Sequence, residues 1–129
     1  VEAVLLGRQA MGEAMHEGLF RDRWRIRHGG KLVHAEELRL EGNIGELTRS
    51  EPVLSGQVAF ATLLYIGPLA EALLPKIRAI AGFSGGASAW QGKLVIRLSA
   101  PDGFTMRKML FPIISLLRNG APVPKVWNL

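Results

Sequence analysis

Two carboxylates and an imidazole are the side chains of this sequence that could most readily act together. A hairpin that turns through His28–Gly30 would place Asp22 opposite Glu36, with His34 as a near neighbour on the same face. Carboxylate oxygens and an imidazole nitrogen suit a borderline cation such as nickel. We prefer a simpler interpretation, ordinary cross-strand pairing at a solvated end of the sheet, because neighbouring arginines would compete for both carboxylates.

Enzymatic chemistry finds little support in the sequence. The chain has no cysteine, which excludes disulfides, thiolate metal sites and cysteine nucleophiles. Its three histidines show no short metal-ligand spacing such as His-x-x-x-His. Two serines lie among glycines and alanines in residues 83–88, and we interpret this segment as a turn after a helix rather than a nucleophile site. We therefore predict that the protein is not an enzyme.

Three side chains in the second half are candidates for a structural or an interface role. Arg97 lies among apolar strand residues and is predicted to pair with a carboxylate or with backbone carbonyls, a structural role being preferred. Arg118 begins a tail with two prolines that leads to Trp127. Trp127 either docks onto the protein's own core or anchors a partner, since Trp and Arg are typical interface hot-spot residues.

The N-terminus carries a charged corner. Gly7 and Gly12 lie five residues apart, with Arg8 beside the first glycine and Glu13 beside the second. We expect Arg8 and Glu13 to hold a turn together. The chain starts without Met in an apolar segment, so we also expect it to be part of a longer protein that is entered within a strand.

The elements that would position these residues begin with a hairpin. Residues 19–27 and 31–40 both alternate between apolar and polar side chains, which is typical of strands. We prefer a three-residue turn, His28–Gly30, over a two-residue turn at Gly29-Gly30, because only the former keeps both apolar sets in phase. That face would then carry Phe20, Trp24, Ile26, Leu32, Leu38 and Leu40.

The second half is predicted to be a strand–helix–strand–strand–helix unit. Residues 57–66 form a continuous apolar run suited to a strand that is buried on both faces. A helix follows and ends at Gly82. Two strands joined by a turn at Gln91-Gly92 come next. Asp102 then caps a second helix, which ends at Asn119-Gly120. Pro75 predicts either a kink in the first helix or a later start of it, and Pro112 predicts a bend in the second. The fold class is thus α+β and β-rich, an antiparallel β layer followed by this unit, with residues 1–129 as one domain or the C-terminal part of a larger one.

Composition limits the partners. The chain has 129 residues, 48% of them hydrophobic, and no apolar run near the ~20 residues that span a bilayer, so we expect a globular cytoplasmic protein without a membrane. The net charge is +5, and only Arg21, Arg23, Arg25 and Arg27 are clustered. With one tyrosine and no aromatic interleaving, nucleic acid is a poor fit, and an acidic protein partner or a solvated face is preferred. A basic RNA-binding α+β module remains the alternative.

Several segments in succession resemble a known family. They are Gly7-Arg8-x-Ala10-Met11-Gly12-Glu13, then Gly18-Leu19-Phe20-x-Asp22-Arg23-Trp24-x-Ile26-Arg27 with Glu37-Leu38-Arg39-Leu40, then Phe60-Ala61-Thr62-Leu63-Leu64, Ser88-x-x-x-Gly92-x-Leu94-Val95-Ile96-Arg97-Leu98, and Leu117-Arg118 to Pro124-Lys125-x-Trp127. Their order resembles the C-terminal half of the urease accessory protein D family (UreD, UreH in some bacteria). The family usually has Arg where Lys125 stands, and its proteins are roughly twice as long.

The resemblance implies a urease maturation factor that is not an enzyme. The chain would then form part of a larger, β-helical-like sheet structure. The protein would act as a scaffold that binds urease apoprotein and accessory protein F. It would associate with accessory protein G, a nickel-carrying GTPase, through F. It would have no tightly bound cofactor and would pass nickel in transit to the urease active site. The candidates for lining that path are Glu13, Glu17, Asp22 and Glu36.

Overall fold

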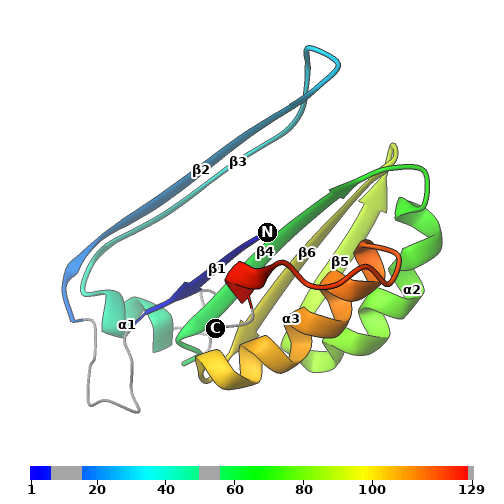
Figure 1. Ribbon diagram of the computed structural model, residues 1–129. Helices are drawn as coiled ribbons and strands as arrows, with labels where there is room; N and C mark the ends of the chain where they lie inside the picture. Colours follow the sequence, from blue (N-terminus) through cyan, green and yellow to red (C-terminus); the bar gives the residue numbers. More distant parts are fainter. Residues whose placement is uncertain (7–15, 50–55, 128–129) are drawn as a thin grey trace.

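The sheet that carries most of the fold has four antiparallel strands. The computed structural model describes residues 1–6, 16–49 and 56–127 of the chain (Figure 1). Strands β1 (Glu2–Leu5), β4 (Ala59–Ile66), β5 (Gly85–Trp90) and β6 (Lys93–Ala100) pair in the spatial order β1-β4-β6-β5. Strands β1 and β5 are therefore the edges of this sheet, and β4 and β6 are central.

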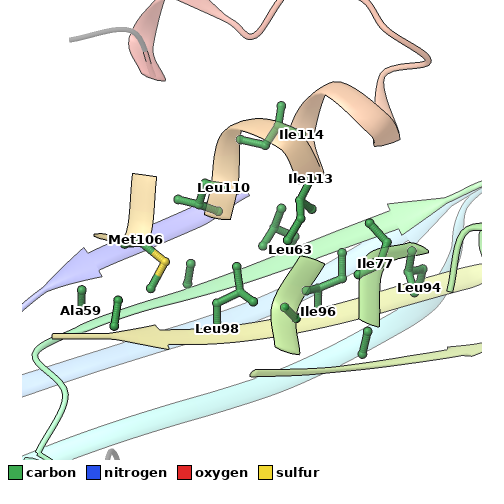
Figure 2. Packing of buried hydrophobic residues seen from close by; sticks show 14 of the residues in the cluster. Ala59, Leu63, Ile77, Leu94, Ile96, Leu98, Met106, Leu110, Ile113 and Ile114 are labelled. Atoms are coloured by element: carbon green, nitrogen blue, oxygen red, sulfur yellow. The ribbon is translucent and has the colours of Figure 1, made fainter. Parts of the chain in front are cut away.

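Two helices cover one face of the sheet. Helices α2 (Ala70–Ala81) and α3 (Gly103–Leu117) lie side by side against it, and their apolar side chains meet those of β4 and β6 (Figure 2). The largest side chains at the centre of this core are fully buried: Leu63, Ile77, Leu94, Ile96 and Ile113. Along β4, fully buried residues alternate with half-buried ones. The prediction that this strand is buried on both faces is thus wrong, because only its helix-facing side lies in the dense core.

The helix ends follow the local signals. The Asp102 side chain accepts a hydrogen bond from the Thr105 backbone N–H at 2.6 Å and caps α3 as predicted. Gly82 ends α2 with φ of 54°, a conformation that favours glycine. Both helices continue through their prolines, Pro75 and Pro112. The order β4–α2–β5–β6–α3 confirms the predicted strand–helix–strand–strand–helix unit, with a short 3₁₀ turn, η2 (Gly82–Ser84), before β5.

A long hairpin stands apart from the four-stranded sheet. Strands β2 (Gly18–His28) and β3 (Lys31–Gly42) pair only with each other among the described residues. They extend as an arm over the sheet, on the side away from the helices (Figure 1). A short helix, α1 (Ile44–Arg49), follows β3, and a 3₁₀ turn, η3 (Lys125–Trp127), lies near the C-terminus.

The hairpin differs from its prediction in the turn and in the register. The turn has two residues, Gly29-Gly30, with φ of 57° and 76°, which is typical of the type I′ turn that matches strand twist. A bulge opposite Ile26/Arg27 inserts one extra residue of β3 and restores the apolar phase. Asp22 consequently lies opposite Leu38, and not opposite Glu36 as predicted.

The bulge also decides which side chains share the inner face of the hairpin. Below it, Phe20, Trp24 and Ile26 lie on one face with Leu38 and Leu40, as predicted. Leu32, beyond the bulge, pairs with Arg27 and so belongs to the opposite face. The prediction that Leu32 is in phase with the apolar set is therefore wrong.

A small second core fixes the base of the hairpin. Leu6, Leu40 and Ile44 are buried there, each from a different segment. The rings of Phe20 and Phe60 meet edge to face with centroids 5.7 Å apart, which joins β2 to β4. Apolar packing thus anchors the hairpin at its base, while its remainder meets the sheet through polar side chains.

Candidate functional site

A pocket of about 640 Å³ lies between the hairpin and the open face of the sheet. The hairpin contributes three carboxylates, those of Asp22, Glu36 and Glu37, and two leucines, and strands β4 and β6 contribute small polar and apolar groups together with one guanidinium. The turn before β5 forms another part of the wall. The lining includes Asp22, Glu36, Leu38, Leu40, Phe60, Thr62, Phe83, Gly86, Arg97 and Ser99.

The strand register explains why these side chains face the pocket. Glu2 pairs with Thr62, Thr62 with Arg97, and Arg97 with Gly86, so these four residues form one line across the sheet. The strand neighbours of Thr62 and Arg97 are buried against the helices, and successive side chains of a strand point to opposite faces. A Cβ atom at Gly86 would have no heavy atom within 4 Å, so this edge of the line is open.

Glu36 is the centre of the charged group in the pocket. Its carboxylate accepts a hydrogen bond from the Arg97 guanidinium, and His34 Nε2 lies 3.2 Å from the same carboxylate oxygen. Arg97 thus pairs with a carboxylate, as predicted, but its side chain is 63% exposed rather than buried. Because an exposed ion pair contributes at most about 1 kcal/mol, this contact positions the hairpin more than it stabilises the fold.

Two further polar contacts tie the hairpin to the sheet. The Trp24 indole N–H donates to Glu2 Oε2 at 3.0 Å, which links β2 to β1. The Lys93 ammonium donates to the Val33 carbonyl, at the bulge of β3, and lies 4.6 Å from the centroid of the Trp90 ring. The hairpin is therefore connected to β1 and β6 through side chains and not through a backbone ladder.

Glu2 interacts with Asp22, a lining residue of the pocket, to form a carboxyl pair. Burial raises the pKa of Glu2 above its ordinary value of 4.5, and the hydrogen bond and charge of Asp22 raise it further. The Trp24 indole, which stabilises the ionised form, only partly opposes this. A raised pKa means that the folded state holds the Glu2 proton more tightly than the unfolded chain does.

Replacing Glu2 with glutamine is expected to flatten the pH dependence of stability above pH 4.5. In the wild type, ionisation of Glu2 lowers the free energy of unfolding as pH rises from 4.5 through the raised pKa. Gln stays neutral and still accepts from Trp24, so Glu2→Gln should be more stable than the wild type at pH 7 and about equally stable at pH 4. Thermal unfolding from pH 4 to 7 measures this, with the exposed Glu17→Gln as control. A gain that persists unchanged at pH 4 would contradict it.

The structure brings some of the predicted site residues together and separates others. Asp22 and Glu36 line one pocket with Arg97, although the two carboxylates are not opposite each other. Glu17 is exposed and does not line the pocket, and Arg118 is exposed where α3 ends. Arg8 and Glu13 lie outside the described residues.

Trp127 is half-buried and packs against the helix–sheet core together with Val123. This is the first of its two predicted alternatives, docking onto the protein's own core.

Sequence reasoning missed Glu2, Thr62 and Phe83 as parts of the site. Glu2 occupies an inward position of a short strand that is otherwise apolar, which is a weak signal for a polar pocket.

The sequence analysis also overlooked a motif of nucleophilic serines at residues 82–86, where Gly-Phe-Ser-Gly-Gly has the spacing of a nucleophile elbow. That motif requires a strand before the serine and a helix after it, whereas Ser84 follows α2 and precedes β5. The structure therefore gives no support to a nucleophilic Ser84.

The pocket brings carboxylates together without forming a closed metal site among the described residues. Among residues 1–6, 16–49 and 56–127, no group of three or more His, Asp or Glu side chains is arranged to hold a metal ion. Arg97 already neutralises Glu36 in part, and Asp22 has Glu2 beside it. A cation could therefore meet one or two carboxylates here, but not a closed ligand shell. Within the same residues, no helix is long and apolar enough to cross a membrane.

Comparison with known proteins gives one consistent result. The family model described as UreD urease accessory protein matches residues 1–128. The chain is 84% identical over 129 residues to urease accessory protein UreD of Agrobacterium fabrum, covering 100% of this chain and 45% of that protein. It is 68% identical to UreD of Rhizobium rhizogenes over 130 residues and 46% identical to UreD of Mesorhizobium japonicum over 133, each time covering 100% of this chain and 48% of the relative. The chain thus spans about half the length of the curated relatives it matches.

Proposed function

The chain belongs to the UreD family of urease accessory proteins, and from this premise we propose that it serves urease maturation in the cytoplasm as part of a scaffold without catalytic activity. The observation that carries the proposal is the family match over residues 1–128. The partners we propose are urease apoprotein and accessory protein F directly, and accessory protein G through F. The geometry is compatible with this role, because the most developed site is an open pocket beside a hairpin arm rather than a catalytic centre.

Nickel is the cargo in this proposal, and the pocket between hairpin and sheet is its candidate passage. A transit site must release its ion, so weak binding by one or two carboxylates suits it better than a closed site. Asp22 and Glu36 supply such oxygens, and Arg97 limits how strongly Glu36 can hold a divalent cation. Glu13 and Glu17 remain candidates for the same path outside this pocket.

The scaffold proposal is tested by co-purification. The full-length protein should be retained with urease apoprotein and with accessory protein F when the three are co-expressed. Deletion of the gene should leave urease without nickel. If neither partner is retained and urease is activated normally in the deletion strain, the proposal fails.

The role of the pocket carboxylates is tested by Asp22→Asn combined with Glu36→Gln in the full-length protein. Both changes keep shape and a hydrogen-bond acceptor, so Glu36→Gln can still accept from Arg97. We expect partners to co-purify as before while the nickel content of urease falls several-fold. Glu41→Gln with Glu46→Gln removes the same charge from exposed positions and should leave nickel content unchanged. Normal nickel loading by the pocket variant would remove the pocket from the path and leave the scaffold role standing.

A further inference from the structure

The outer face of the hairpin, opposite the pocket, presents a row of arginines. Arg21, Arg23, Arg25 and Arg27 occupy alternate positions of β2 and are all exposed. Alternate residues of a strand lie about 6.6–6.8 Å apart, so the row extends over roughly 20 Å. The proposed function does not use this face, since none of its arginines lines the pocket.

One half of the row shows how a carboxylate binds there. Glu37 of β3 lies between two arginines, with Oε1 2.6 Å from Arg21 Nε and Oε2 3.4 Å from Arg23 Nε. The Arg21 hydrogen bond and the nearby Arg23 charge lower the pKa of Glu37. A single carboxylate therefore fits between neighbouring arginines of this row.

The other half of the row lacks such a carboxylate. Among the described residues, neither Arg25 nor Arg27 forms an ion pair, and Arg25 donates only to the backbone carbonyls of Trp24 and Glu36. The residues opposite them on β3 are uncharged: Ala35 faces Arg25, and Leu32 faces Arg27 with 46% of its surface exposed. This half of the face thus combines two available guanidinium groups with a small apolar surface.

We propose that the Arg25–Arg27 half of the outer face docks an extended acidic segment of a partner protein. A carboxylate of the partner lies between Arg25 and Arg27, as Glu37 lies between Arg21 and Arg23. Carboxylates two residues apart on an extended segment have the same spacing as the arginines. An apolar side chain next to them contacts Leu32, which removes exposed apolar surface from water.

The composition of the face favours protein over nucleic acid. Single-stranded nucleic acid is held by bases stacked on aromatic rings, and the aromatic residues of the hairpin, Phe20 and Trp24, belong to its inner face. On the outer face, Glu37 and Glu41 would repel phosphates. An extended peptide with its own charge pattern can avoid these two positions, whereas a regular phosphate backbone cannot.

The test uses the full-length protein and three fluorescent probes. These are a peptide of alternating Glu and Val, the same peptide with Gln in place of Glu, and a single-stranded RNA of matched length. We expect the Glu peptide to bind in a salt-dependent manner and the other two to bind much more weakly. Arg25→Glu with Arg27→Glu should weaken Glu-peptide binding about tenfold or more. Arg107→Glu with Lys108→Glu, which makes the same charge change on exposed positions of α3, should change it little.

Several outcomes would overturn the proposal. Equal losses in the hairpin and α3 variants would show that only net charge attracts the peptide. Tighter binding of RNA than of the Glu peptide would assign the face to nucleic acid. Absence of peptide binding, or a marked fall in thermal midpoint for Arg25→Glu with Arg27→Glu but not for the α3 variant, would show that the rest of the full-length chain covers this face. None of these outcomes alters whether urease apoprotein and accessory protein F co-purify.

Discussion

Replacing Gly85 with alanine is expected to lower the free energy of unfolding by about 3 kcal/mol. Gly85 opens β5 beside the central strand β6, and an added Cβ would lie 2.1 Å from the Arg97 carbonyl oxygen and 2.8 Å from a methyl group of Leu98. The first of these atoms is backbone, so the clash can be relieved only if the edge strand moves. Chemical denaturation of purified wild type and variant measures the loss.

Gly86→Ala is the matched control for this prediction. At Gly86 an added Cβ would meet no heavy atom within 4 Å, so the same chemical change should cost well under 1 kcal/mol. If both substitutions cost the same, the close approach of β5 to β6 at Gly85 is not what requires glycine there.

The second half of the fold could be predicted because its signals are local. An acidic cap at Asp102 and a glycine stop at Gly82 act within one turn of the helices that they end. The apolar run of β4 and the glycine turn before β6 are local as well. Such signals place elements along the chain, but they say little about which face of a strand is covered.

The hairpin register could not be predicted, because a bulge is not visible in an alternating pattern. The two-residue turn shifts the pairing by one residue from the predicted register, and the extra residue in β3 shifts it by one more in the same direction. The inner face keeps its apolar composition in either case. The pairing of Asp22 nevertheless moves by two residues, from Glu36 to Leu38, so the shorter turn and the bulge together remove the predicted pairing of the two carboxylates.

The pocket depends on contacts between distant parts of the sequence. Glu36 and Arg97 are 61 positions apart, and Trp24 and Glu2 come from strands that belong to different sheets. The sequence identified Asp22 and Glu36 as neighbouring carboxylates of the hairpin, and Arg97 as a charge among apolar strand residues. It could not show that they line one space, because that follows from how the hairpin lies over the sheet.

Leu63 and Leu64 provide the sharpest test of how the two faces of the sheet differ. Leu63 is fully buried between β4 and the helices, whereas Leu64, the next residue, lies half-buried on the hairpin side. Leu63→Ala is expected to lower the free energy of unfolding by about 3–4 kcal/mol, since the close-packed core cannot collapse around the lost side chain. Leu64→Ala should cost about half as much or less, because it removes less buried apolar area.

The comparison of these two variants also bears on the open face of the sheet. Denaturant unfolding of both should be measured in this chain and again in the full-length protein. In this chain, equal losses would contradict the one-sided burial that leaves room for the pocket. The free energy of unfolding lost in Leu64→Ala can be larger in the full-length protein while the loss in Leu63→Ala is unchanged. In that case, parts of the protein outside this chain contribute to covering the hairpin-facing side of the sheet. An unchanged ratio would instead leave the pocket open to partners and to nickel, as the proposed function requires.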